Sequence, residues 1–200
     1  MKKKICDSSV MFHTSKTHSQ IIFSLQMYDC KHEDIVGEDG WYSGEIVEGT
    51  SLSVGYYNYK YGAFGDIEKL SADIASIIGS QKFIESINYI IPVPNYNSEK
   101  MKNLVKKISK KLDIEFLDVL TNNSKEYMKK IKISERSKKF DFISCADITN
   151  INGNILLIDD FVETGTTFRE CVKAIKNINP NINITRVAIF RTHLTLEELE

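Results

Sequence analysis

The sequence predicts an α/β protein in which helices flank a central parallel sheet, and three observations lead to this expectation. From residue 67 onward, apolar runs typical of strands alternate with amphipathic patterns typical of helices, which is the order found in parallel sheets. The run Ile155–Ile158 shows no polar alternation, as expected of a strand that is covered on both faces. The length of 200 residues favours one domain, and 42% hydrophobic residues permit a sizeable core.

The N-terminal part of the sequence is the least regular, and we expect residues 1–55 to form a small hood of strands and loops before a core over residues 56–200. Ile21–Leu25 predicts a strand, and Gly40–Gly44 predicts a turn or loop. Val54–Tyr61 alternates aromatic and polar side chains, which favours a half-buried strand. A lid whose tyrosines stack on a planar base is the alternative.

The elements after residue 66 follow in order along the chain. Apolar residues over Ile67–Ile78 recur at helical spacing and predict a helix that ends near Gly79. Ile87–Val93 predicts a strand, and its pairing should stop at Pro92 and Pro94 because proline has no amide hydrogen. The remaining patterns predict a helix over 101–112, a strand over 114–120, a strand over 155–158, a helix from about residue 166 and a strand over 184–190.

Two adjacent acids, Asp159 and Asp160, directly follow the run Ile155–Ile158. Ligands of parallel sheets bind beyond the carboxyl ends of the strands, which is where we expect these acids to lie. Ionised carboxylates only accept hydrogen bonds, and a ribose 2,3-diol offers two donors side by side, so the pair matches a ribose. A solvated turn at a strand end is the alternative interpretation.

A glycine and three threonines follow the acids before the next helix. Gly165 lets the backbone turn sharply and approach a ligand closely, and Thr164, Thr166 and Thr167 add hydroxyl donors. We expect the helix to begin at Thr166 or Thr167, so that its first amides and its dipole form an anion site. An ordinary helix cap is the alternative for the loop alone, but the strand, acids and loop together favour a ligand with sugar hydroxyls and a phosphate.

Residues 155–167 consist of four apolar residues, two acids, two apolar residues, two variable residues, a glycine, one variable residue and a threonine. This order resembles the phosphoribosyl pyrophosphate (PRPP) binding motif of type I phosphoribosyltransferases, and it implies the α/β fold of that family. The resemblance implies that Asp159 and Asp160 hold the ribose hydroxyls. It also implies that the 5-phosphate is bound by Glu163, Thr164, Gly165, Thr166 and Thr167.

Glu163 stands at a variable position of this motif. Purine phosphoribosyltransferases have an acid there, so the resemblance implies a proton acceptor or hydrogen-bond partner for the nitrogen of a base. A solvated loop acid is the alternative. Together with the acids that are expected to bind ribose, Glu163 completes the set of candidate catalytic residues, which is Glu163, Asp159 and Asp160.

The segment Pro92–Lys100 stands where the family has its pyrophosphate loop. Right-handed crossovers would bring this segment to the same rim of the sheet as the acids. Its candidate contacts are Val93, Pro94, Ser98 and Lys100, and Lys102 follows in the next helical turn. Residues 94–99 hold no arginine or lysine, whereas related enzymes usually carry a basic residue there, so a structural turn closed by two prolines is the alternative.

Residues 121–139 are polar and strongly basic, with seven positive and two negative side chains. The resemblance implies a mobile loop in this part of the fold. Closure of such a loop over the leaving pyrophosphate would neutralise charge and exclude water, and the candidate residues for this role are Lys130, Arg136, Lys138 and Lys139. A solvated basic run is the alternative.

The order of these pieces over Tyr56–Thr192 resembles the competence-protein-F (ComF) group of phosphoribosyltransferase-like proteins. The prolines of the Pro92–Lys100 segment, the run Glu135–Phe140 and the acid motif carry this resemblance. That group often has an N-terminal cysteine cluster for zinc, whereas this chain has only Cys6 and Cys30 there, so we expect the zinc site to be lost. The alternative is a metal site formed by Cys6, His13, His18, Cys30 and His32.

The resemblance implies an enzyme that binds PRPP with Mg²⁺ and transfers the phosphoribosyl group to a nucleobase-like acceptor, with release of pyrophosphate. The transition state would resemble a ribosyl cation, which electrostatic interactions stabilise. Magnesium prefers phosphate oxygens and water, so we expect it to arrive with PRPP, with Asp159 as a candidate contact through water. The alternatives are a non-catalytic PRPP- or nucleotide-binding protein of the ComF type in DNA uptake or regulation, and a nucleic-acid adaptor that uses the lysine run.

Composition limits the cellular locations and the classes of binding partner that we expect. A net charge of −1 argues against a duplex-binding surface, and no apolar run approaches the length of about eighteen residues that a membrane span requires. A signal peptide would require an apolar stretch after Lys2–Lys4, and the sequence has none there. We therefore expect a cytoplasmic protein without membrane or direct nucleic-acid binding, and we leave a homodimer open. The resemblance implies a role in nucleotide metabolism.

Overall fold

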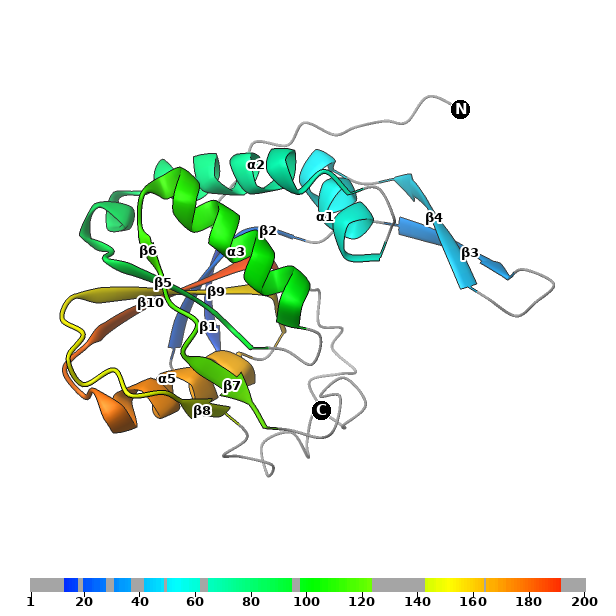
Figure 1. Ribbon diagram of the computed structural model, residues 1–200. Coiled ribbons are helices and arrows are strands. Elements are labelled where there is room, and N and C mark those ends of the chain that lie inside the picture. Colours follow the sequence, from blue (N-terminus) through cyan, green and yellow to red (C-terminus); the bar gives the residue numbers. More distant parts are fainter. Residues whose placement is uncertain are drawn as a thin grey trace.

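The computed structural model describes residues 13–17, 20–27, 31–36, 42–48, 50–61, 65–94, 98–123, 143–163 and 165–191. A six-stranded sheet in the order β1-β2-β10-β9-β5-β6 forms its centre (Figure 1). Neighbouring strands of this sheet run parallel, except β1 and β2. The sheet consists of β1 (His13–Thr17), β2 (Gln20–Met27), β5 (Tyr89–Pro92), β6 (Glu115–Phe116), β9 (Asn154–Val162) and β10 (Asn183–Arg191).

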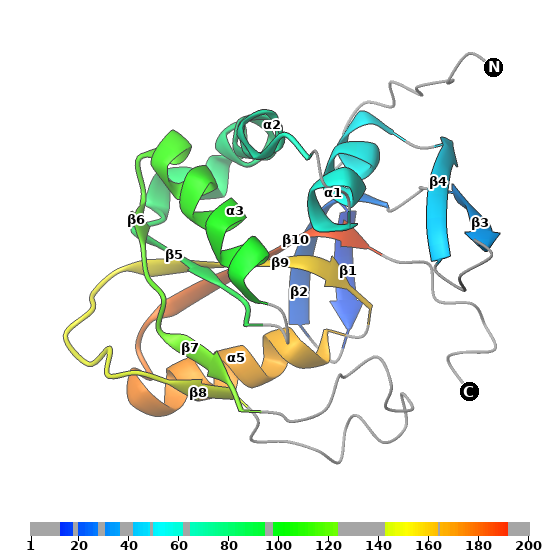
Figure 2. The same cartoon turned by 45° about the vertical axis from the view of Figure 1, so that its right-hand side comes forward.

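Helices cover both faces of this sheet (Figures 1 and 2). One face carries α1 (Ser51–Tyr61), α2 (Ile67–Gly79) and α3 (Ser98–Leu112), and the other carries α5 (Thr166–Ile178). Alternate residues of β9 enter two apolar cores, because Leu156 and Ile158 pack with the three helices whereas Ile155 and Leu157 pack with α5. The expected α/β class, a parallel core flanked by helices, is confirmed. The smaller elements are η1 (Lys82–Ser86), the antiparallel pair β3 (Lys31–Val36) and β4 (Tyr42–Glu48), and the antiparallel pair β7 (Leu120–Asn122) and β8 (Ile143–Cys145).

The helices α2, α3 and α5 form where apolar spacing predicts them. Ile74 and Ile78 of α2 are fully buried, as are Leu104 and Ile108 of α3, and these residues belong to one core on the sheet. Helix α5 begins at Thr166, as expected. Over the ranges given above, no helix combines the length and the apolar character that crossing a membrane requires.

The segment Val54–Tyr61 is helical and forms most of α1, so the prediction of a half-buried strand was wrong. Leu52 and Tyr56 are buried, and residues four apart share one face of a helix. The alternation of tyrosines with polar residues imitates a strand, but the face that turns inward follows the helical spacing. The alternative, a lid that stacks on a base, stays a prediction.

Three strand boundaries also differ from expectation. Residues 42–44, expected in a turn or loop, lie in β4. The strand expected over 114–120 is replaced by the short β6, and β7 begins at Leu120. Strand β9 continues past Ile158 to Val162, and its register with β10 includes Asp159, Phe161 and Val162.

Two N-terminal strands belong to the central sheet. Strand β2 pairs in parallel with β10, and β1 pairs antiparallel with β2. By contrast, β3 and β4 form a separate two-stranded sheet. The division of the chain into a hood over 1–55 and a core over 56–200 stays a prediction.

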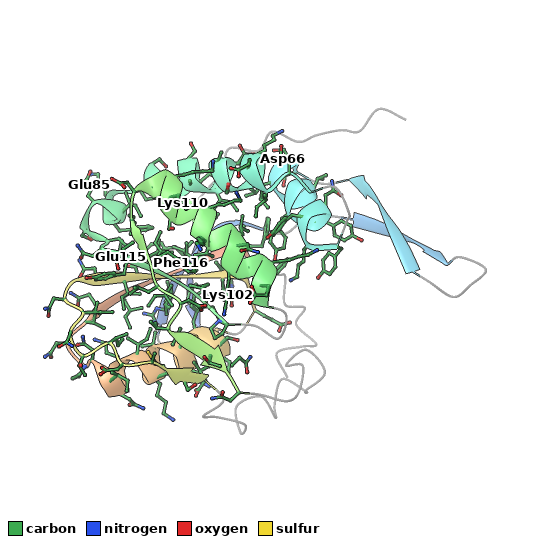
Figure 3. The ribbon with its side chains drawn as sticks, viewed as in Figure 1. Asp66, Glu85, Lys102, Lys110, Glu115 and Phe116 are labelled. Carbon is green, nitrogen blue, oxygen red and sulfur yellow. The ribbon has the colours of Figure 1, made fainter. Side chains whose placement is uncertain are left out.

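Replacement of Asp66 by alanine should destabilise the fold, because the Asp66 carboxylate caps α2 where this helix follows α1 (Figure 3). It accepts hydrogen bonds from the amides of Glu68 and Lys69, both at 3.0 Å. Loss of such a cap costs about 1 kcal/mol, which urea unfolding of Asp66→Ala would measure. Asp73 is exposed on the same helix, and Asp73→Ala should change the free energy of unfolding by less than about 0.5 kcal/mol. Equal losses in the two variants would contradict the cap.

Candidate functional site

The acid pair lies inside the last part of β9. Ile158 stands beside Pro92 of β5, and Asp159 stands beside Ala188 of β10, so the acids lie just past the end of β5. Asp159 and Asp160 are both buried, with 6% and 7% of their surfaces exposed. Because side chains alternate along a strand, Asp160 lies on the face of α1 and Asp159 on the face of α5.

Helix α1 supplies two donors to Asp160. The Tyr56 hydroxyl and the Lys60 ammonium both donate to Oδ2 at 2.5 Å, and the Phe161 amide donates to Oδ1 at 2.9 Å. Burial raises the pKa of Asp160, but the charge of Lys60 and the side-chain hydrogen bonds outweigh burial and hold this pKa below its usual value. Asp160 is therefore ionised at neutral pH.

The pKa of Asp159 is shifted in the opposite direction from that of Asp160. One of its oxygens accepts a hydrogen bond from the amide of Asp160 at 2.8 Å. Burial raises the pKa of Asp159 well above its usual value, and the negative charge of Asp160 raises it further. The site thus pairs a carboxyl whose pKa is lowered with a carboxyl whose pKa is raised, and the role of the two acids as ribose acceptors stays a prediction. A neutral carboxyl can also donate a hydrogen bond.

Aromatic rings enclose the two donors from α1. The ring of Tyr56 packs against Phe161 and Phe190, with centroids 5.7 and 5.2 Å apart. Burial and then the charge of Asp160 raise the pKa of Tyr56, so its hydroxyl stays a neutral donor. Lys60 Nζ lies 5.5 Å from the ring centroid of Tyr56 and 5.2 Å from that of Phe161, where cation–π attraction adds to the ion pair.

A reciprocal contact joins the end of α1 to the start of α3. The Lys100 ammonium donates to the carbonyls of Tyr59 at 3.2 Å and Lys60 at 2.9 Å, and the Tyr59 hydroxyl donates to the carbonyl of Lys100 at 2.5 Å. The last carbonyls of a helix have no partner inside it, so Lys100 caps α1. Lys102, which Figure 3 shows at the end of α3 near α1, forms an ion pair with Asp118 at 3.0 Å.

The other expected pyrophosphate contacts lie at the end of β5. Val93 and Pro94 are buried, and the Val93 amide donates to the carbonyl of Ile158 at 2.8 Å. One backbone hydrogen bond therefore follows Pro92, the last residue of the strand. Ser98 begins α3, and its side chain is outside the described part of the structure. Pyrophosphate binding by this segment stays a prediction.

The turn between β9 and α5 has a backbone suited to an anion. Gly165 adopts the left-handed conformation with φ 74°, which glycine accepts without strain. Thr166 is buried, and Glu163 and Thr167 are half-buried. The first amides of a helix have no partner inside it and point out of its N-terminus, as an anion site needs.

Several expected residues lie outside the described part of the chain. These are Thr164, the mobile-loop candidates Lys130, Arg136, Lys138 and Lys139, and Cys6, His18 and Cys30 of the alternative metal site. Conversely, Tyr56 and Lys60 are site residues that sequence reasoning missed. Their one signal is a spacing of four residues, which becomes meaningful only once Ser51–Tyr61 is recognised as a helix.

The acid pair does not fit a Mg²⁺ site held by the protein. Burial raises the pKa of Asp159, and Asp160 faces the ammonium of Lys60, whereas Mg²⁺ prefers charged oxygen ligands with regular geometry. Among the described residues, no group of three or more His, Cys, Asp or Glu side chains is placed to hold a metal ion. The arrival of Mg²⁺ with PRPP stays a prediction.

Comparison with known proteins gives similar structures only. No family model and no curated protein matches the chain. Adenine phosphoribosyltransferase from Leishmania donovani is similar at 11% identity and a TM-score of 0.40, over 68% of this chain and 73% of that one. Hypoxanthine phosphoribosyltransferase from Staphylococcus aureus is similar at 13% identity and a TM-score of 0.37, over 62% of each chain. Glutamine PRPP amidotransferase from B. subtilis is similar at 12% identity and a TM-score of 0.42, over 78% of this chain and 34% of that one.

Identities and TM-scores of this size say nothing of the substrate or the activity of this chain. The first two of these structures are phosphoribosyltransferases by name. The resemblance to the ComF group stays a prediction.

Replacement of Asp159 by asparagine should stabilise the protein at neutral pH. The raised pKa of Asp159 means that, above about pH 4, the unfolded chain releases a proton that the folded chain keeps. The free energy of unfolding of the wild type therefore falls as pH rises through this range. Asp159→Asn has no such proton, and its amide oxygen can still accept the hydrogen bond from Asp160.

Urea unfolding of the wild type and Asp159→Asn between pH 4 and pH 7 would measure this effect. We expect the variant to gain stability over the wild type as pH rises, with the smallest difference near pH 4. Asp73→Asn, on the exposed side of α2, should show no such trend. A constant difference between wild type and Asp159→Asn at every pH would contradict the raised pKa.

Proposed function

We propose that the carboxyl end of β9 binds PRPP and that the protein transfers its phosphoribosyl group to a nitrogenous base, with release of pyrophosphate. One observation carries this proposal: a buried acid pair and a left-handed glycine at a helix start follow one another on a single strand end. The acids suit sugar hydroxyls, and the helix start suits a phosphate. Their separation of a few residues suits the two ends of ribose 5-phosphate.

The two acids would meet the ribose in different ways. Asp160 is ionised and accepts hydrogen bonds, whereas Asp159 favours a neutral carboxyl that can donate as well as accept. The 5-phosphate would lie against the amides of the Gly165–Thr167 turn. A ribosyl cation that forms as pyrophosphate leaves would be stabilised by the negative charge of Asp160, without a covalent nucleophile.

Glu163 is proposed to act near the ribose carbon at which transfer occurs. It is half-buried in the turn between Val162 and Gly165, so it stands between the proposed ribose and phosphate contacts. A carboxylate there can accept a proton or a hydrogen bond from the attacking nitrogen of a base. The acceptor is therefore proposed as a nucleobase-like molecule with a ring nitrogen.

A second candidate function is binding of PRPP or a nucleotide without turnover, as in a ComF-type protein of DNA uptake or regulation. The lack of arginine and lysine in residues 94–99 favours it, because transfer requires positive charge that stabilises the leaving pyrophosphate. Pyrophosphate release from PRPP with a panel of nucleobases separates the two functions. Release with any base supports transfer, whereas PRPP binding without release supports the second function.

Combined replacement of Asp159 and Asp160 by asparagine should weaken PRPP binding. Loss of hydrogen bonds to a charged group costs about 1.5–3 kcal/mol, so calorimetric titration with PRPP and Mg²⁺ should show a loss of at least about tenfold in affinity. Asp73→Asn should bind as the wild type does. Unchanged affinity in the folded double variant would exclude the acid pair from the ligand site.

Replacement of Glu163 by glutamine should lower turnover much more than PRPP affinity. General base catalysis contributes about 10²- to 10⁴-fold to a rate, whereas a neutral side chain of the same shape leaves the phosphate contacts in place. Steady-state kinetics and PRPP titration of Glu163→Gln would measure both quantities. Glu85, which Figure 3 shows at the opposite end of the molecule from α1, provides the control Glu85→Gln. Equal turnover in the two variants would remove Glu163 from the mechanism.

A further inference from the structure

We propose that Lys60 is a specificity-determining residue: its ammonium pairs with Asp160 in the free protein and moves to the diphosphate group of PRPP when the ribose hydroxyls take its place. This inference rests on the proposed function and assigns a ligand contact to α1. It predicts that the protein prefers PRPP to ribose 5-phosphate because only PRPP offers Lys60 a new partner.

The acceptor sites of Asp160 are nearly all in use. A carboxylate accepts about four hydrogen bonds, and Asp160 already accepts from Tyr56, Lys60 and the amide of Phe161. A ribose 2,3-diol brings two donors. Tyr56 and Lys60 both donate to Oδ2, so a ribose hydroxyl can bind this oxygen only if one of these two donors leaves.

Lys60 is the donor that can leave. Tyr56 is 3% exposed and packs against Phe161 and Phe190, so its hydroxyl cannot move without repacking the core. The side chain of Lys60 is 23% exposed and ends a flexible four-carbon stem. The amide of Phe161 belongs to the strand itself and stays in place.

The location of Lys60 puts it between the acids and the segment expected to hold pyrophosphate. Its backbone is tied to the start of α3, because the Lys60 carbonyl accepts from the Lys100 ammonium at 2.9 Å. The Val93 amide bonds to the carbonyl of Ile158, so this segment leaves the sheet beside the acids. Figure 2 shows α1 above the ends of β9 and β10 and next to α3.

Binding of a diphosphate requires positive charge, and the neighbouring Lys100 and Lys102 already bind other groups of the protein. Residues 94–99 contain no arginine or lysine. Lys100 donates to carbonyls of α1, and Lys102 pairs with Asp118. The partner of Lys60, by contrast, is a carboxylate that the ribose is proposed to occupy, so ligand binding itself would release this ammonium.

The exchange gives the Lys60 ammonium a new anionic partner only when the ligand is PRPP. Lys60 would trade one charge-assisted bond to a carboxylate for another to a phosphate, while ribose hydroxyls and Tyr56 keep Asp160 hydrogen-bonded. Ribose 5-phosphate has the same diol and 5-phosphate but no diphosphate. Its binding would displace Lys60 without giving the ammonium a new anionic partner, and this difference provides selectivity.

The experiment is a calorimetric titration of wild type, Lys60→Met, Lys60→Arg and Lys69→Met with PRPP and with ribose 5-phosphate at fixed Mg²⁺. Lys60→Met should lose at least about tenfold in PRPP affinity and keep or gain affinity for ribose 5-phosphate, so the preference collapses. Lys60→Arg keeps the charge and should keep most of the preference. Lys69, exposed on α2, is the matched control and should behave as the wild type.

The outcomes separate this inference from the proposed function. If the wild type binds PRPP but Lys60→Met keeps the same preference for PRPP over ribose 5-phosphate, the inference is overturned and the proposed function stands. If the wild type binds neither ligand, the proposed function fails and the inference fails with it. Stable folding of each variant is checked by its unfolding transition.

A measurement on the wild type tests the same point if Lys60→Met does not fold. Amine labelling followed by mass spectrometry reports the accessibility of the Lys60 ammonium. Ribose 5-phosphate should increase labelling of Lys60 relative to the free protein, and PRPP should give less labelling than ribose 5-phosphate. Equal labelling of Lys60 with both ligands would overturn the inference.

Discussion

The buried negative charge of Asp160 determines how α1 docks at the end of β9. A carboxylate removed from water is costly unless it is paired and hydrogen-bonded, and Asp160 obtains both from α1 through Lys60 and Tyr56. These contacts require α1 to dock with one defined face toward the sheet. Lys100 then ties the end of α1 to the start of α3. The charge in the central strand thereby orients α1, and α1 in turn contacts the start of α3.

The two acids differ because a strand places neighbours on opposite faces. Asp160 meets a cation and a phenol on the face of α1, so it keeps its charge. Asp159 lies on the other face, where burial and the charge of Asp160 favour its proton. Two identical residues therefore offer a ligand different chemistry, an acceptor beside a group that can also donate. Such a pair suits neighbouring hydroxyls, each of which can both donate and accept.

Sequence reasoning succeeded where a long periodic pattern settles the structure by itself. The run before Asp159, the helices α2 and α3 and the start of α5 follow from apolar spacing and from Gly165. It failed for α1, because four tyrosines in alternation imitate a strand and the true signal joins only Leu52, Tyr56 and Lys60. That signal acquires meaning through Asp160, which stands 104 residues from Tyr56. The placement of β2 beside β10 likewise depends on a contact between distant segments that no local pattern encodes.

Lys100 and Lys60 illustrate why position along the chain is a poor guide to a residue's partner. Lys100 follows a strand and a loop, where a phosphate contact is expected, but the open carbonyls at the end of α1 lie within its reach and take its hydrogen bonds. Lys60 precedes that loop by more than thirty residues, but its ammonium lies on a proposed ribose contact. Residues 94–99 contain no arginine or lysine, so the sequence of the loop alone predicts a weak phosphate site. The structure changes this prediction, because Lys60 of α1 provides a cation beside the loop, and binding of the ribose at Asp160 would free its ammonium for a phosphate.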